Sequence, residues 1–196
     1  MVADTKSDID VAEDATVEEL VEDLASSSRR DRQHAASRIA QIAAEKPEDV
    51  MPFVDRLIDG LNRKEARTRW ELLDALSRVC AVDASLVESA LEDAEGSLFD
   101  EQNGTVRLSA FRLYCRYGQA SAANADKVWP LLNEAIQCYH GDPEFQDMLI
   151  ALLEFSAADL SDQVKEGLRE RMSFDAENNK GMLQKRAKQI FDNVSC

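Results

Sequence analysis

The chain has few of the residues that interrupt regular structure. Its 196 residues include only seven glycines and four prolines, and aromatic residues make up 6%. Alanine, leucine, glutamate and aspartate are abundant instead, which favours helix over sheet. No segment alternates polar and apolar residues between hairpin turns, so no strand is expected. The composition therefore predicts an all-α protein.

Long apolar runs are also missing. No stretch of about 18 apolar residues is present, so we expect no membrane-spanning helix and no membrane partner. Residues 1–8 lack a basic region followed by an apolar one, which argues against a secretion signal. Together with free cysteines, this predicts a cytoplasmic protein.

Metal-binding and catalytic patterns are absent as well. None of the four cysteines forms a C-x-x-C pair, and we expect Cys80 and Cys115 to be core thiols because they lie in apolar helical stretches. The only histidines, His34 and His140, are not at ligand spacing from a cysteine pair. There is no Ser-His-Asp set, phosphate-binding glycine loop or HExxH motif. We therefore expect no metal, no cofactor and no catalytic residues.

Charge is abundant and unevenly placed. The net charge is −15, and residues 1–24 hold nine acids against one base. We predict that residues 1–15 form a disordered acidic arm and that residues 16–196 form a single domain. The arm is either a solvated tail or a mobile segment that docks on a basic surface. The overall sign argues against nucleic acid, since nucleic-acid binding depends on lysine and arginine.

A repeated residue frame is the strongest pattern in the sequence. A leading residue is followed by apolar or small residues three, four and seven positions later. The leaders are separated by 37, 38, 39 and 37 residues, and the fifth frame is weaker. They are Arg32, Arg69, Arg107, Gln146 and Leu183. A fixed period of this length indicates stacked helical pairs, each of which needs a neighbour to bury its apolar face.

The periodicity predicts ten helices in five pairs. Thr16 and Glu19 form a capping box at the first start, and Pro47 ends the second helix. The architecture expected is a right-handed α-solenoid of about five hairpins. The expected helices run from 16 to the serines at 26–28, then over 30–45, 48–61, 64–81, 84–98, 105–118, 123 to the turn at 141–143, 143–157, 161–173 and 177–193.

This frame resembles the HEAT repeat. In that family the first helix of a pair often carries a proline in its opening turns, as in Val50-Met-Pro52 and Val128-Trp-Pro130. The second helix often opens with Val-Arg, which Val106-Arg107 matches, and Arg32 and Arg69 match at the arginine. The resemblance spans about residues 16–194 and implies a HEAT/armadillo-like α-solenoid.

The resemblance also implies roles for two groups of residues. The leading arginines Arg32, Arg69 and Arg107 would tie neighbouring repeats together, with Asp23 and Asp59 as possible partners of the first two. Second helices line the concave surface in this family, and the positions five and nine beyond each leader would face it. These are Ser37, Gln41, Asp74, Arg78, Arg112, Arg116, Ala151 and Phe155.

The middle repeats thus place Asp74, Arg78, Arg112 and Arg116 in the expected groove. Two interpretations remain open: a solvated face with local ion pairs, or a site for the carboxylates or phosphates of a partner segment. We expect a non-catalytic scaffold or adaptor that binds a protein or peptide, with an acidic or phosphorylated segment as the partner. The alternatives are a HEAT-like enzyme, related to DNA alkylpurine glycosylases or bilin lyases, and a regulatory subunit inhibited by its own acidic arm.

Overall fold

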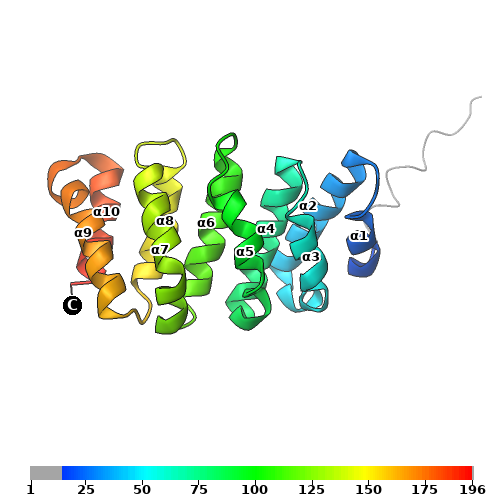
Figure 1. Cartoon of the computed structure of the whole chain (residues 1–196), viewed down its shortest axis with the longest axis horizontal. Helices are drawn as coiled ribbons and strands as arrows, with labels where there is room; N and C mark the ends of the chain where they lie inside the picture. Colours follow the sequence, from blue (N-terminus) through cyan, green and yellow to red (C-terminus); the bar gives the residue numbers. More distant parts are fainter. Residues whose placement is uncertain (1–14, 196) are drawn as a thin grey trace, which may run out of the picture.

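The computed structural model describes residues 15–195, and these residues form α-helices without any strand. The chain runs steadily along one long axis, with neighbouring helices stacked side by side (Figure 1). The predicted acidic arm lies outside the described residues, apart from Ala15, which packs against the core. The helices are α1 (Val17–Asp23), α2 (Arg29–Glu45), α3 (Val54–Gly60), α4 (Ala66–Val82), α5 (Ala90–Leu98), α6 (Gly104–Gly118), α7 (Ala122–Cys138), α8 (Phe145–Ser156), α9 (Asp162–Asn178) and α10 (Gly181–Asn193).

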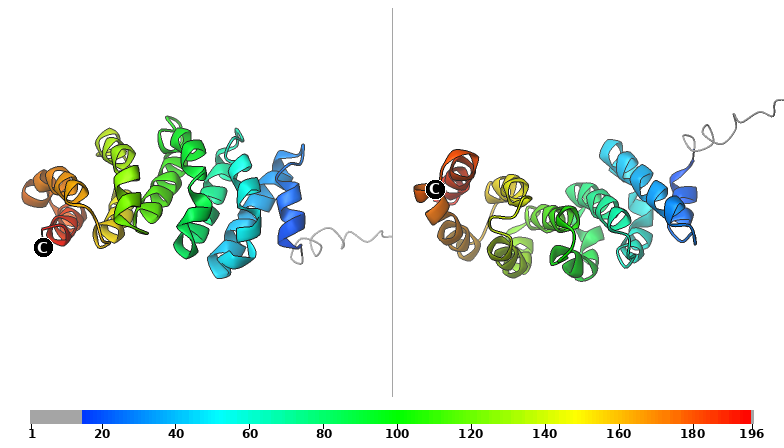
Figure 2. Two further views of the ribbon diagram at one scale, coloured as in Figure 1. Left: turned by 60° about the horizontal axis from the view of Figure 1, so that its bottom comes forward. Right: turned by 90° about the horizontal axis from the view of Figure 1, so that it is seen from above.

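Within residues 15–195, four of the five predicted hairpins pack as consecutive pairs, α1 with α2, α3 with α4, α5 with α6 and α9 with α10, whereas α7 packs mainly on α6 and α9. The second helices of the pairs pack on one another in a row, α2 on α4, α4 on α6, α6 on α8 and α8 on α10. Seen from above, this row lies on the inner side of a gentle curve, and the first helices lie on the outer side (Figure 2). The fold is therefore an all-α solenoid whose second helices form the concave wall.

Side-chain caps begin several helices where the sequence predicts. The capping box of Thr16 and Glu19 is confirmed, with both of its hydrogen bonds formed. Ser28, Asn103, Ser121 and Ser161 accept a hydrogen bond from a backbone N–H in the first turn of α2, α6, α7 and α9. These caps fix the starts of helices whose stability comes mainly from packing.

Four predicted helices are wrong in their extent. The expected helix 48–61 is two short 3-10 turns, Pro47–Asp49 and Met51–Phe53, followed by α3, because each proline lacks the N–H that a continuous α-helix needs. The expected helix 84–98 is likewise split into a 3-10 turn, Ala84–Val87, and α5. Helix α9 continues to Asn178, and α10 begins at Gly181, whose φ of 67° suits glycine.

One frame is also out of register by a residue. The residues that follow Gln146 at the frame positions include the exposed Ile150, whereas Met148, Leu149 and Leu152 are fully buried. The leader of the fourth repeat is therefore Phe145, and the true steps are 37, 38, 38 and 38. The apolar spine is more regular than the sequence frame suggested.

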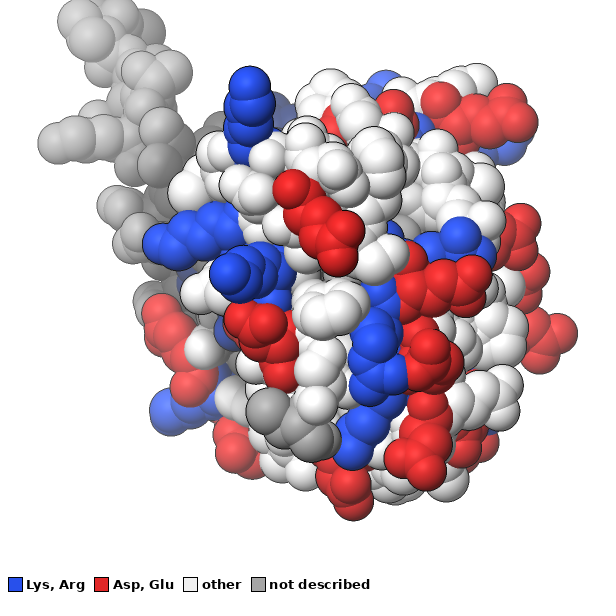
Figure 3. Space-filling model, turned by 90° about the vertical axis from the view of Figure 1, so that its left-hand side faces the viewer, with Lys and Arg blue, Asp and Glu red and all other residues white. Residues whose placement is uncertain are grey.

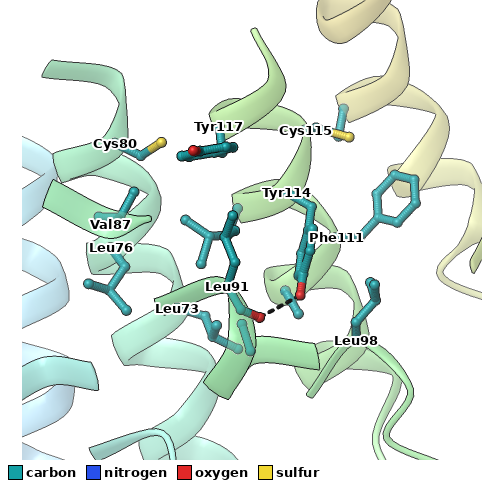
Figure 4. Packing of buried hydrophobic residues seen from close by; sticks show 14 of the residues in the cluster. Leu73, Leu76, Cys80, Val87, Leu91, Leu98, Phe111, Tyr114, Cys115 and Tyr117 are labelled. Carbon is teal, nitrogen blue, oxygen red and sulfur yellow. Dashed lines mark hydrogen bonds between the residues drawn. The ribbon is translucent and has the colours of Figure 1, made fainter. Parts of the chain in front are cut away.

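The core is a single apolar cluster that runs from Leu20 to Val194. Its centre lies between α4, α5 and α6, where the ring of Tyr114 is buried and its hydroxyl donates to the carbonyl of Leu91 at 2.6 Å (Figure 4). Cys80 and Cys115 are buried, as predicted, and Cys138 is exposed. Each repeat thus contributes to one continuous core. The faces of the second helices that point away from this core form the surface of the concave wall.

Two further findings concern the whole described region. Within residues 15–195, no helix has the length and hydropathy needed to cross a membrane. The same residues contain no group of three or more histidine, cysteine, aspartate or glutamate side chains placed to hold a metal ion.

Candidate binding groove

The concave wall contains a hollow of about 580 Å³ formed by four second helices, α2, α4, α6 and α8. Because the repeat step is close to 38 residues, equivalent positions on these helices form rows across the wall. One row is Gln41, Arg78, Arg116 and Glu154, and the next is Asp74, Arg112 and Ile150. The structure therefore brings the four predicted groove residues, Asp74, Arg78, Arg112 and Arg116, to the wall of one hollow.

The rest of the lining is mostly small or apolar. Ile150 is 40% exposed and provides an apolar patch at the α8 side. The small side chains leave room between the charged ones, so that an extended segment could lie against the backbone of the helices. They are Ala40, Ala44, Ala81 and Ala151.

The three arginines of the hollow differ in their partners. Arg116 donates to Glu154 Oε2 at 3.1 Å and to Gln119 Oε1 at 3.0 Å. Among residues 15–195, Arg78 and Arg112 form no hydrogen bond and no ion pair, and both are exposed. Two guanidinium groups in the hollow thus have all of their N–H donors available to a ligand.

Asp74 lies one turn before Arg78 on α4 and in the same row as Arg112, and it is half-buried. Burial raises the pKa of its carboxyl group, a hydrogen bond with Ser109 and the charge of Arg112 oppose this, Glu71 adds to it, and Arg78 opposes it more weakly. Asp74 is therefore a carboxylate for which the charged form is less favoured than in water.

Two residues that the sequence placed in the groove do not line the hollow. Phe155 is fully buried, with its ring against Gly118, so the prediction that it faces the groove is wrong. Ser37 lies beside the hollow and accepts a hydrogen bond from Arg67. The error for Phe155 has a single cause, the one-residue register shift in the fourth repeat.

The sequence analysis missed several lining residues, among them Glu71, Ile150 and Glu154. A constant step of 38 residues from Arg112 and Arg116 leads to Ile150 and Glu154. That signal was available in the sequence once the frame began at Phe145. Glu71 lies one turn before Asp74 on the same helix, and only the curvature of the wall shows that it reaches the hollow.

The leading arginines lie away from the hollow and join consecutive repeats. Arg32 pairs with Glu65, and Arg69 donates to Asp100 Oδ2 at 2.7 Å. Both acids lie just before the next second helix. Asp23 and Asp59 were expected to be the partners, which is wrong, because the guanidinium groups extend toward the following repeat.

Arg107 makes the most extensive of these contacts. Its Nε donates to Glu144 Oε1 at 2.6 Å, and another guanidinium nitrogen donates to the carbonyl oxygen of Asp100 at 2.8 Å. Its guanidinium carbon lies 4.6 Å from the centre of the Tyr139 ring, a cation–π contact. Only 9% of Arg107 is exposed, so these partners, and not water, stabilise its charge.

Asp100 serves two of the arginines at once. Burial alone would raise the pKa of its carboxyl group, but the hydrogen bond from Arg69 and the backbone N–H groups of Gln102 and Asn103 outweigh burial and lower the pKa. The Asp100 carbonyl oxygen meanwhile accepts from Arg107. The loop between α5 and α6 is thereby fixed on both sides.

At one end of the solenoid, charges of both signs are mixed. At the end formed by α9 and α10, lysine and arginine side chains lie directly beside aspartate and glutamate side chains (Figure 3). Ion pairs of this exposed kind contribute at most about 1 kcal/mol each. Arg78 and Arg112 differ from the charged side chains at this end, because neither forms an ion pair within residues 15–195.

Comparison with solved structures supports the fold. A designed armadillo repeat protein in complex with the peptide (KR)4 matches with a TM-score of 0.75 at 15% identity, over 91% of this chain and 81% of that one. An engineered protein matches with a TM-score of 0.69 at 16% identity, over 91% and 79%. A second designed armadillo repeat protein matches with a TM-score of 0.62 at 13% identity, over 91% and 99%.

No family model matches the chain, and no curated protein matches its sequence. The structural matches, at 13–16% identity, define the class of fold. The protein is a repeat α-solenoid of the HEAT/armadillo-like kind.

Proposed function

We propose that the protein is a non-catalytic binding module that holds an extended segment of a partner protein along its concave groove. The partner segment carries acidic or phosphorylated side chains. The observation that carries the proposal is the pair of exposed, unpartnered guanidinium groups of Arg78 and Arg112 inside the hollow. An oxyanion is the ligand that matches such donors best.

The surroundings of the two arginines support a peptide as the ligand. The hollow extends over four repeats, and its alanine-lined floor leaves space for a backbone. Ile150 adds an exposed apolar surface beside Arg112, where a neighbouring apolar side chain of the segment would be buried. A segment with an anionic residue next to an apolar one therefore fits the wall.

A structural neighbour is consistent with this mode of binding. The designed armadillo repeat protein that matches this chain is described in complex with a peptide of lysine and arginine. The present groove offers arginines itself, so the complementary peptide has the opposite charge. We infer that the solenoid of this chain likewise presents an extended binding surface, and that the charges of the side chains on its wall determine the charge of the peptide that binds.

Capture on degenerate peptides tests the proposal. Three libraries with serine, glutamate or phosphoserine at one fixed position are immobilised, and retention of the full chain is measured at low salt. We expect the chain to be retained by the anionic libraries and released by Arg78→Gln combined with Arg112→Gln. The melting temperature should change little, because within residues 15–195 the two exposed guanidinium groups form no hydrogen bond and no ion pair and act on Asp74 only through their charge.

Arg63→Gln combined with Lys64→Gln is the matched control. It removes the same charge from an exposed loop outside the hollow and should leave retention unchanged. Equal retention of the groove variant and the wild type would overturn the proposed function. Equal loss in both variants would mean that net charge, and not the groove, determines retention.

A further inference from the structure

If the groove binds an anionic ligand, as the proposed function states, the carboxylate of Asp74 lies where it would repel that ligand. Asp74 precedes Arg78 by one turn on α4 and occupies the position on α4 that Arg112 occupies on α6. An anion held by Arg78 and Arg112 must therefore come close to Asp74. A like charge at such a site disfavours ionisation of one of the two groups.

The charged and polar side chains around Asp74 determine how the repulsion between its carboxylate and a bound anion can be relieved. On its own helix they are Glu71 and Arg78, and on α6 they are Ser109 and Arg112. From α2, the hollow is lined by the uncharged side chain of Gln41. Arg38 on α2 donates to Gln41 Oε1 at 2.8 Å and does not line the hollow. A ligand anion would therefore have to share Arg78 and Arg112 with Asp74.

The acids and bases at the far side of the hollow already neutralise one another. Arg116 on α6 is engaged by Glu154 on α8, with side chains 36% and 54% exposed. This pair contributes little net charge to the site. The uncompensated charges at the centre of the hollow are therefore those of Arg78, Arg112 and Asp74, and Glu71 lies one turn before Asp74 on α4.

We propose that Asp74 is the specificity-determining residue of the groove, which selects a phosphorylated side chain over a carboxylate by sharing one proton with the bound phosphate. A phosphate monoester has a second pKa of about 6, so its monoanion keeps a P–O–H group near neutral pH. That group donates to the Asp74 carboxylate, while the remaining phosphate oxygens accept from Arg78 and Arg112.

A glutamate or aspartate side chain cannot make this arrangement. Its ordinary pKa is about 4, so at neutral pH it carries no proton to donate to Asp74. Two carboxylates would then face each other across the arginine pair. The raised pKa of Asp74 acts in the same direction, since burial already makes its charged form easier to protonate.

The shared proton makes binding depend on pH. Above a pH of about 6, the free phosphate monoester is a dianion, so the complex that shares one proton with Asp74 must take up that proton on binding. The dissociation constant should then rise by up to about tenfold per pH unit. Replacement of Asp74 by asparagine supplies an amide donor instead, so the phosphate dianion is accepted and this dependence is lost.

The experiment uses three small probes on the full chain, with side-chain NMR signals of the arginines as the readout of binding. Phenyl phosphate can supply the proton, phenyl sulfate is a monoanion of similar shape without it, and phenylacetate carries a carboxylate. At a pH of about 6, we expect phenyl phosphate to bind the wild type at least about tenfold more tightly than the other two. Between a pH of about 6.5 and 8, its affinity should fall as stated above.

Two variants decide the role of Asp74. Asp74→Asn should bind phenyl sulfate and phenyl phosphate with similar affinity and should lose the fall in affinity with pH. Asp55→Asn, which neutralises an exposed acid on α3 outside the hollow, should keep both the preference and the pH slope. The proposal is overturned if Asp74→Asn and the wild type show the same slope and the same preference.

The outcomes also separate this inference from the proposed function. If all three probes shift the signals of Arg78 and Arg112 equally in the wild type, the groove binds anions but Asp74 does not select among them. If none of the probes shifts these signals, the inference fails, and the proposed anion site in the groove fails with it.

Discussion

Arg107 shows how a single buried charge organises this structure. Its guanidinium group contacts Glu144, Asp142, the Asp100 carbonyl oxygen and the ring of Tyr139. The acids come from the loop between α7 and α8, which belongs to the next repeat. Removal of the arginine leaves Glu144 nearly buried without a partner, and that cost exceeds the value of the ion pair itself.

The substitution Arg107→Ala should therefore lower the free energy of unfolding by about 3 kcal/mol. Urea denaturation monitored by circular dichroism measures the change. Arg67→Ala is the control, since Arg67 forms an ion pair with Glu71 at 3.5 Å and an exposed hydrogen bond to Ser37 at 3.4 Å, and its loss should cost less than about 1 kcal/mol. Similar values for the two variants would contradict the structural role of Arg107.

The cysteines give a second test at the level of single side chains. Burial raises the pKa of Cys80 to about 12 and raises the pKa of Cys115 well above its ordinary value, with only weak opposition from Arg116. Below these values both groups remain thiols, which react poorly, whereas Cys138 is exposed.

In a Cys196→Ser background, which removes the cysteine that lies outside the described residues, we expect one thiol to react rapidly with a disulfide reagent at a pH of about 8. Addition of denaturant should release two more. Rapid reaction of two or three thiols in the native protein would show that the core between α4 and α6 is open.

The sequence predicted the side-chain pattern better than the partners. The frame positions that follow Arg32, Arg69 and Arg107 are buried, since a 3.6-residue period directly specifies one face of a helix. The ion-pair partners of these arginines lie 31–37 residues away in loops, and nothing local in the sequence indicates which acid the guanidinium group reaches. Asp23 and Asp59 failed as partners for that reason.

At the level of helices, close packing of neighbouring repeats depends on small residues at crossing points. Gly118 ends α6, and a Cβ atom there would lie 2.5 Å from Phe155 Cε2 on α8 and 3.0 Å from Val128 Cγ2 on α7. Both neighbours are buried and cannot move freely. The glycine thus sets how closely the third and fourth repeats approach.

Gly118→Ala should destabilise the protein by about 1–3 kcal/mol, because the added methyl group overpacks the core. Gly96→Ala is the matched control in the exposed last turn of α5, where an added Cβ would meet nothing within 4 Å. That change should stabilise the protein by about 0.5–1 kcal/mol through helix propensity. The result to look for in thermal melts is an opposite sign for the two variants; equal signs would argue against this packing.

The periodicity predicted which segments are helical, but it did not predict where a helix is interrupted. All five pairs were predicted, but Pro47 and Pro52 divide the segment before α3 into short turns. Pro130 also departs from the expected place in an opening turn, since it lies inside α7. Tertiary packing decides whether a proline ends a helix or is tolerated in it, and a single sequence does not contain that information.

At the level of the whole molecule, the architecture assigns the two arginine sets to different surfaces. Arg32, Arg69 and Arg107 lie between repeats, and Arg78, Arg112 and Arg116 lie on the concave wall. The resemblance to the HEAT repeat implied this division for both sets. It could not reveal that Glu154 already engages Arg116, since that depends on the curvature of the wall and the rotamers on it.

The proposed function rests on this division, which arginine side-chain NMR of the full-length protein measures directly. On titration with the anionic peptide best retained in the capture experiment, we expect the Nε–Hε signals of Arg78 and Arg112 to shift with a common dissociation constant. Signals of Arg32, Arg69 and Arg107 should stay in place. Shifts confined to arginines outside the concave wall, with Arg78 and Arg112 unaffected, would contradict the account.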